Sequence, residues 1–416
     1  MNKFVFGNDF NRVRIALHGL LACIALLQLG HARAASCSGE ALVDVTLPSG
    51  AAWQLCWELR NEEGVVLKEV AYKTPQGTLR NVLKEASLAH INIAYDDGSP
   101  GQHLLTDHAN GGLGSNVHTL SALDCSAGNL HADAGSDVLC AKVVPRGYAI
   151  KSYGVVTQGH MLVLESRSSI GSHSFIVRWQ FYDDGSIEPR VGRSGTLPII
   201  GTDANYGWPL DDTNRIGVGF NTSYFWRLDF DLGADGSNES IEEFEVTPSA
   251  DRLKKSLSVS TLATETSRSV SPDLKRSWRV REIASGLSNS DGRPLSYNNE
   301  PLHTAHSYSC TATESWAQSD IHFTRHNACE RFVVNNPTAS GCAADITGFI
   351  NGENINGADV VLWYKLNYHH LPRSEDEPGQ QIHWDSFILI PRDWTATNPL
   401  AQLLINPKPN QLPGLM

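Results

Sequence analysis

From residue 40 onward, apolar and polar positions alternate in short runs, a pattern typical of half-buried β-strands. Three clear runs of this kind span residues 175–182, 224–232 and 360–370. Turns rich in Asp and Gly, such as 183–185, separate such runs. Helical periodicity is scarce, and the Ser/Thr-rich stretch 256–271 is expected to be a loop or an extended connection. The pattern predicts a mainly β protein built as one large antiparallel β-sandwich.

Composition and charge agree with a folded domain. The chain has 416 residues, of which 41 % are hydrophobic and 19 % charged, so a disordered or collagen-like chain is excluded. The formal net charge is −12 and no Lys/Arg-rich run exists, so we expect no nucleic-acid partner. The ten Trp, eleven Tyr and thirteen Phe suit a core of aromatic side chains.

Residues 1–34 are predicted to be a signal peptide rather than part of the fold. Basic residues precede an apolar run at 15–29, and Ala32-Arg33-Ala34 forms a small-residue cleavage site. A lipoprotein site at Cys23 is a weaker alternative, because this cysteine lies inside the apolar run. The run is shorter than the roughly 20 residues that a membrane span needs, and no later segment qualifies. We therefore expect an exported protein, periplasmic or secreted.

The cysteines also suit an exported protein. Seven cysteines follow the signal peptide: Cys37, Cys56, Cys125, Cys140, Cys310, Cys329 and Cys342. Disulfides are expected in the oxidising compartment that an exported protein meets. Because seven is odd, at least one thiol is free or pairs between chains. No C-x-x-C motif is present, so neither a zinc ribbon nor a thioredoxin-type site is indicated.

Two strands carry candidate chemistry. Strand alternation places Asp229 and Asp231 on one face, and with the carbonyl of Phe230 they form half of a hard-cation site. A solvated strand face is the alternative interpretation. The adjacent His369 and His370 point in opposite directions in a strand, and His370 shares the apolar face. An inward histidine of this kind is either a hydrogen-bonded core residue or a metal ligand.

Several segments of the chain resemble those of a known protein family. His370-Leu371-Pro372-Arg373-Ser374-Glu375-Asp376 resembles the His-x-Pro-Arg-x-Glu-Asp segment of copper amine oxidases. The segments 57–67, 85–89, 185–188, 278–280, 359–364 and 391–399 also match that family's catalytic domain in order. The similarity runs from about residue 41 to 403. It implies that residues 35–416 form the family's catalytic β-sandwich, that the protein is a homodimer, and that copper and topaquinone are the expected cofactors of primary-amine oxidation.

The chain departs from that family at its cofactors. The family makes its quinone from a tyrosine, and the ungapped match puts His173 at that position. An imidazole cannot be oxidised to the quinone. Counting back from Arg227, the first two copper-ligand positions hold Phe220 and Thr222, and His370 alone fills the third. Copper and topaquinone are therefore not expected here, although His173 and His370 could form a sparse two-imidazole site.

Other family positions are retained, by the same resemblance. Asp107 lies where the family keeps its general base, and Tyr95 lies where the family hydrogen-bonds the quinone. The family's second, structural cation site, which we expect to hold calcium, corresponds here to Asp229, the Phe230 carbonyl, Asp231, Asp359 and the Val360 carbonyl. The resemblance also pairs Cys125 with Cys140.

Three functions stay open. The first, which the sequence favours, is an exported relative that does not oxidise amines and binds a small molecule or serves a structural role. The second is a metal-free acid/base enzyme in which Asp107 and His173 carry protons and Asp107 raises the pKa of His173. The third is a primary-amine oxidase that uses an unrecognised cofactor route.

Overall fold

The computed structural model describes residues 35–401, apart from 97–102, 107–110, 153–154, 199, 234–235, 252, 285–286, 302–313 and 339–340. The predicted signal peptide, Asp107 and Cys310 lie outside the described residues. Within the described ranges, no helix has the length and apolar character needed to cross a membrane.

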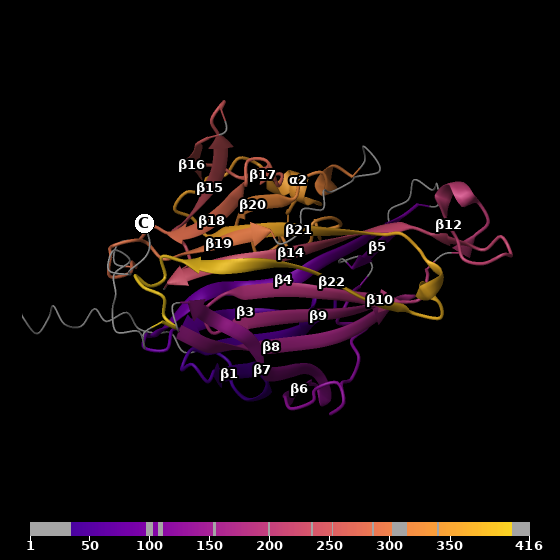
Figure 1. Ribbon diagram of the computed structural model, residues 1–416, viewed down its shortest axis with the longest axis horizontal. Helices are drawn as coiled ribbons and strands as arrows, with labels where there is room; N and C mark the ends of the chain where they lie inside the picture. The colour runs from indigo at the N-terminus through magenta and orange to yellow at the C-terminus, as the bar shows by residue number, and fades with distance from the viewer. Residues whose placement is uncertain are drawn as a thin grey trace, which may run out of the picture.

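Two large sheets and one small sheet make up the described part of the chain (Figure 1). The nine-stranded sheet contains β1 (Leu42–Thr46), β2 (Ala52–Arg60), β3 (Gly64–Lys73), β4 (Leu79–Tyr95), β5 (His103–Thr106), β14 (Phe220–Gly233), β17 (Thr266–Arg268), β20 (Ile321–Arg325) and β21 (Val360–His370). The ten-stranded sheet contains β6 (Asn129–Asp133), β7 (Ser136–Ser152), β8 (Val155–Ile170), β9 (His173–Tyr182), β10 (Ile187–Gly195), β15 (Glu239–Pro248), β16 (Lys255–Leu262), β18 (Ser277–Glu282), β19 (Ser296–Pro301) and β22 (Gln380–Arg392).

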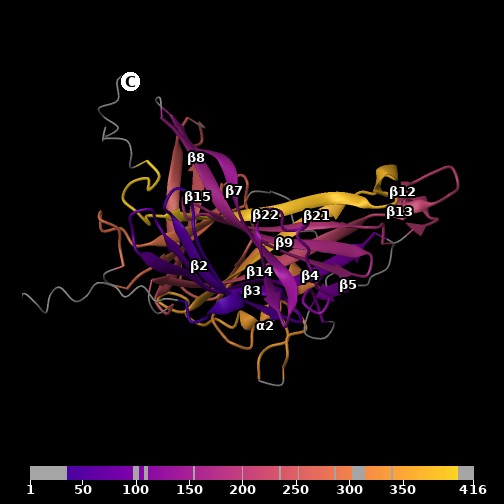
Figure 2. The same ribbon diagram turned by 90° about the horizontal axis from the view of Figure 1, so that it is seen from below.

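The small sheet joins β11 (Ile200–Gly201), β13 (Ile216–Val218) and β12 (Gly207–Pro209) at one end of the molecule (Figure 1). Helical segments are short: η1 (Gly39–Ala41), η2 (Ala204–Tyr206), η3 (Ser315–Ala317), α2 (Ile346–Phe349) and η4 (Ser374–Asp376). Figure 2 shows α2 on the side of β14 that faces away from β9 and β22. This arrangement confirms the antiparallel β-sandwich expected from the sequence.

Strand positions follow the hydrophobic pattern closely. The three runs singled out in the sequence coincide with β9, β14 and β21. The stretch 256–271, expected to be a loop or an extended connection, is extended but forms two paired strands, β16 and β17. Strand β16 lies at the edge of its sheet and most of its side chains are exposed, so backbone pairing with β15 holds it without an apolar face.

Aromatic side chains fill the space between the sheets. Trp226 of β14 meets Trp179 of β9 edge to face, with ring centroids 5.1 Å apart, and both are almost fully buried. Tyr364 of β21 and Phe387 of β22 meet with ring centroids 4.4 Å apart and ring planes tilted by 40°. Each such side chain buries a large apolar area, so these contacts across the two layers hold the sheets together.

Three disulfides lie in the described residues, Cys37–Cys56, Cys125–Cys140 and Cys329–Cys342. They confirm the expectation of disulfide bonds and the pairing of Cys125 with Cys140 that the resemblance implied.

Candidate functional site

The ends of several strands meet between the two sheets at one end of the sandwich. Phe220, the first residue of β14, is paired with Tyr95 at the end of β4 and with His370 at the end of β21. From the opposite sheet come His173, which begins β9, and Arg193 of β10. We call Tyr95, His173, Arg193, Phe220 and His370 the inter-sheet site. Four of the five were named from the sequence, and the fold brings them together.

His173 is held as a neutral imidazole at this site. Its Nδ1 lies 2.7 Å from Nη2 of Arg193, which can only donate, so Nδ1 is an acceptor. The ring proton therefore sits on Nε2 and points at the hydroxyl oxygen of Tyr95, 2.9 Å away. Burial and the charge of Arg193 lower the pKa of His173 to about 3. The pairing with Asp107 that was expected to raise this pKa is untested, because Asp107 lies outside the described residues. Among the described residues, the charged neighbour of His173 is the guanidinium of Arg193, and it lowers the pKa.

Arg193 occupies the middle of the inter-sheet site. Its side chain is 2 % exposed, and its Cζ lies 3.9 Å from the ring centroid of Phe220. Nη1 donates to Oε1 of Gln380 at 3.0 Å, while Nε is buried without a hydrogen-bond partner. Both hydrogen-bond partners of this guanidinium, Gln380 and His173, are neutral. Among the described residues, Arg193 makes no ion pair with a carboxylate, so a positive charge is buried here without direct neutralisation.

His370 closes the site from the side of β21. It is 8 % exposed and its neighbour His369 is exposed, which confirms that the two rings point in opposite directions. Nε2 of His370 lies 2.7 Å from Oδ2 of Asp376, and the hydroxyl of Tyr368 lies 3.2 Å from Nδ1. The ring stacks on Phe220 at 4.9 Å. Burial lowers the pKa of His370 despite the hydrogen bond to Asp376.

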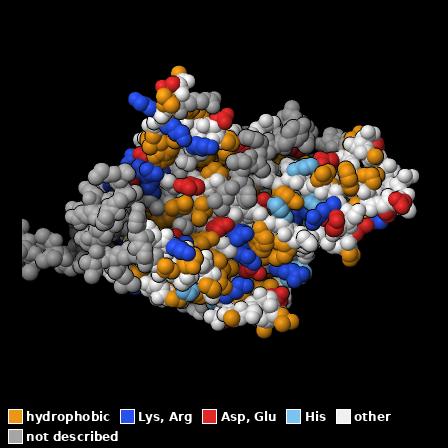
Figure 3. Space-filling view, in the orientation of Figure 1, with side chains coloured by type: hydrophobic (Ala, Val, Ile, Leu, Met, Phe, Trp, Pro, Cys, Tyr) orange, Lys and Arg blue, Asp and Glu red, His pale blue; other side chains and the backbone are white. Residues whose placement is uncertain are grey.

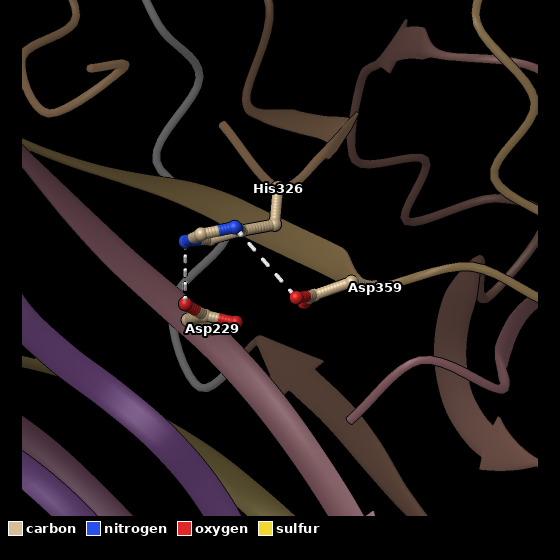
Figure 4. A group of neighbouring side chains, drawn as sticks. All are labelled: Asp229, His326 and Asp359. Carbon is tan, nitrogen blue, oxygen red and sulfur yellow. Dashed lines mark ion pairs between the residues drawn. The ribbon is translucent and has the colours of Figure 1, made fainter. Parts of the chain in front are cut away.

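A second group of polar side chains lies at the opposite ends of β14 and β21. Asp229 near the end of β14, Asp359 just before β21 and His326 just after β20 have ligand atoms within 4.8 Å of one another. We call these three the cation cluster. Figure 4 shows His326 reaching toward both carboxylates, with Nε2 3.3 Å from Asp229 and Nδ1 3.6 Å from Asp359.

The cation cluster contains buried oxygens that lack hydrogen bonds. Asp229 is 1 % exposed, and burial, together with Asp359, raises its pKa. One carboxylate oxygen of Asp229 and one of Asp359 are buried without a hydrogen-bond partner. Lys84 partly compensates the charge, since its Nζ lies 3.1 Å from Asp359. Oxygen ligands with unused lone pairs are what a hard cation requires.

Other residues expected at this cation site lie nearby in a different arrangement. Asp231 is outside the 4.8 Å group, and its Oδ2 accepts a hydrogen bond from Asn81 at 2.8 Å. Phe230 and Val360 lie in β14 and β21 next to the two clustered carboxylates. Their carbonyls therefore belong to the residues that directly follow Asp229 and Asp359 in the sequence.

Two site residues escaped the sequence reasoning. His326 directly follows β20, which pairs with β21, so a histidine placed there was a usable signal. In β10, Ile187, Val191 and Arg193 all fall on odd positions and are buried. Strand alternation thus indicated that Arg193 faces inward.

Comparisons with known proteins identify a family and several relatives of this chain. The family description "Copper amine oxidase, enzyme domain" matches residues 146–409. A primary amine oxidase of Pisum sativum is 22 % identical over 403 residues, covering 84 % of this chain and 58 % of that protein. A histamine oxidase of Arthrobacter globiformis is 22 % identical over 391 residues, covering 84 % and 56 %.

Two solved structures share the fold. A copper-containing benzylamine oxidase from Hansenula polymorpha has a TM-score of 0.71 at 16 % identity, covering 88 % of this chain and 62 % of that one. An amine oxidase from Aspergillus nidulans has a TM-score of 0.70 at 20 % identity, covering 97 % and 57 %. The chain thus spans somewhat under two thirds of the length of these relatives.

Proposed function

This chain belongs to the copper amine oxidase family, and we propose that it is a member that does not oxidise amines through copper and topaquinone but binds a small molecule at the inter-sheet site. The observation that carries the proposal is Arg193, whose permanent positive charge lies over the ring of Phe220 at a family copper-ligand position.

The donor set at the inter-sheet site supports this proposal because it does not fit copper. Copper sites in proteins are built from imidazole and sulfur ligands. Of the family's three ligand positions, Phe220 and Thr222 offer no imidazole. Both ring nitrogens of the remaining His370 have hydrogen-bonding neighbours, Asp376 and Tyr368. A guanidinium in the same space would repel a divalent cation.

The presence of His173 at the family's quinone position also supports the proposal. The family's quinone derives from a tyrosine, and an imidazole cannot be converted to it. Both ring nitrogens of His173 are engaged, by Arg193 and Tyr95, which also disfavours the two-imidazole metal site considered from the sequence. Amine oxidation needs a carbonyl electron sink, and the described residues of this site supply none.

The proposal is tested by measuring peroxide release from benzylamine by the purified protein supplied with Cu²⁺ under air. We expect none, and none from His173→Tyr, since Phe220 and Thr222 still leave copper without ligands. Peroxide production by the wild-type protein would overturn the proposal. A far-UV circular dichroism spectrum checks that both proteins are folded.

We further propose that the cation cluster binds a calcium-type ion. Its unpartnered buried oxygens on Asp229 and Asp359 support this. So does the raised pKa of Asp229, which burial and the Asp359 carboxylate cause even though Nη2 of Arg227 lies 3.8 Å away.

Export and dimer formation are proposed from the sequence and the family. Residues 1–34 have the pattern of a signal peptide, and the disulfides suit an oxidising compartment. The sequence resemblance to the family suggests a homodimer. Cell fractionation of a tagged full-length chain tests the first, and light scattering of the purified protein tests the second.

A further inference from the structure

A pocket of about 340 Å³ opens beside the inter-sheet site. Its walls include Arg193, Tyr368, His370, Arg373 and Asp376. The volume lies at the lower end of the range for small-molecule sites in proteins. The pocket therefore suits a ligand of a few non-hydrogen atoms, bound next to a buried guanidinium.

The charges on the walls of this pocket are predominantly positive. Arg193 and Arg373 are guanidinium ions at any physiological pH. Asp376 is the one carboxylate among the described lining residues, and it is already engaged by the ring of His370 and by the backbone N–H of Arg373, which donates to Oδ2 at 3.0 Å. The pocket thus carries a net positive charge.

Within the part of the chain that the structure describes, the charge of Arg193 has no ionic partner. Its two hydrogen-bond partners are neutral, and its buried Nε makes no hydrogen bond. A desolvated charge of this kind is costly unless an opposite charge approaches it. The guanidinium is also the group that pairs best with planar oxyanions, because its N–H donors match their oxygens.

We propose that this pocket binds a small oxyanion, a carboxylate or a phosphate, through the charges of Arg193 and Arg373. The inference rests on the proposed function, because a copper ion at the family's ligand position Phe220 would lie against the positive charge of Arg193. The fixed charge of Arg193 takes over the positive charge that a metal ion gives the family's site, and the ligand preference changes with it. A protonated amine is repelled and an anion is attracted.

The surface near this pocket agrees with the proposal. Figure 3 shows histidine and basic side chains side by side, with acidic side chains next to them, toward the end of the molecule that carries β12. Nε of Arg373 donates to Oδ1 of Asp376 at 3.4 Å, which partly balances its charge. Its side chain is 52 % exposed, so its outer N–H groups can meet a ligand at the mouth while Arg193 meets it inside.

The test compares ligands of similar shape and opposite charge by isothermal titration calorimetry. Benzoate and inorganic phosphate represent the two oxyanion classes, and benzylammonium is the cationic counterpart of benzoate. We expect saturable binding of at least one anion and no binding of benzylammonium. The tighter of the two anions identifies the ligand class.

Arginine variants test whether the anion binds in this pocket. Arg193→Met should weaken anion binding by about tenfold or more, because a charge-assisted hydrogen bond is lost. The matched control is Arg190→Met on the same strand, whose guanidinium lies 5.2 Å from the ring centroid of Trp384 and does not line the pocket. We expect the control to bind like the wild type. If Arg193→Met does not fold, Arg373→Met at the half-exposed mouth should weaken binding severalfold.

The outcomes separate this inference from the proposed function. Binding of benzylammonium as tight as that of benzoate, or anion binding unchanged in both arginine variants, would overturn the oxyanion site. So would a lack of binding of both anions to the wild-type protein. Peroxide release from benzylamine in the same preparation would overturn the proposed function instead.

Discussion

Strands β14 and β21 lie side by side, and each end of this strand pair carries a different kind of site. At one end, Phe220 and His370 flank the guanidinium of Arg193. At the other end, Asp229 and Asp359 face His326. The first end buries a positive charge among neutral rings. The second buries negative charge with unpartnered oxygens.

By the two proposals above, one β-scaffold keeps a cation site at one end and has lost one at the other. Backbone pairing holds Phe220 opposite His370 whatever their side chains are, because strand register depends on the hydrophobic faces and the turns. A few side chains then decide which charge each end attracts. The two ends should therefore respond in opposite ways to added cations.

The largest expected effect concerns the cation cluster. Calcium at about a hundred times its dissociation constant should stabilise the protein by about 2.7 kcal/mol relative to chelator-treated protein, since it binds only the folded state. Thermal unfolding with calcium and with chelator measures this difference.

Asp229→Asn should abolish the calcium effect, because it removes a buried carboxylate of the cluster. The matched control, Asp273→Asn, changes an exposed carboxylate and should leave the calcium effect unchanged. Identical melting curves with calcium and with chelator for the wild-type protein would contradict a cation site at this end.

The next effect concerns the pH dependence of the inter-sheet site. The pKa of His173 is about 3 in the folded protein and 6.5 in the unfolded chain. Between these values the unfolded chain binds the extra proton, so stability falls as the pH is lowered. From pH 7.5 to pH 5.0 this group should cost about 2 kcal/mol of unfolding free energy.

Urea denaturation at the two pH values tests this effect. The glutamine of His173→Gln cannot titrate. This variant should therefore lose about 2 kcal/mol less unfolding free energy on acidification than the wild type. His369→Gln, at an exposed position, serves as the control and should keep the full loss. An equal acid sensitivity of wild type and His173→Gln would show that His173 is not a buried neutral imidazole.

Much of the fold was accessible from the sequence, because period-two alternation of large apolar residues marks strands directly. Strands β9, β14 and β21 were found in this way. The edge strand β16 was missed because its side chains are mostly exposed and polar. Its stability comes from backbone pairing, which leaves no hydrophobic signature.

The candidate site was predictable in position and less so in chemistry. Matching the family's segments placed Tyr95, His173 and His370 in one site, and the structure brings these three residues together. The charge state of His173 could not be read from the sequence, because it depends on Arg193, which arrives from another strand. Asp107, expected as a general base, lies outside the described residues.

The smallest effect concerns Tyr95. Tyr95→Phe removes the hydroxyl that accepts the Nε2 proton of His173, which should cost about 1 kcal/mol of stability by leaving a buried donor unpaired. Urea denaturation at pH 7.5 measures this loss. Tyr206→Phe, at an exposed hydroxyl, is the control. A loss no larger than in the control would mean that the Tyr95–His173 hydrogen bond contributes nothing to folding.

The central claim is that Arg193 has replaced the metal charge at the inter-sheet site, and the copper content and visible spectrum of the protein test it most directly. The protein is saturated with Cu²⁺ under air, freed of loosely held ions by gel filtration, and examined by elemental analysis and absorption spectroscopy. The account predicts substoichiometric copper and no absorption band in the visible region. One copper ion per chain together with a quinone band would contradict it.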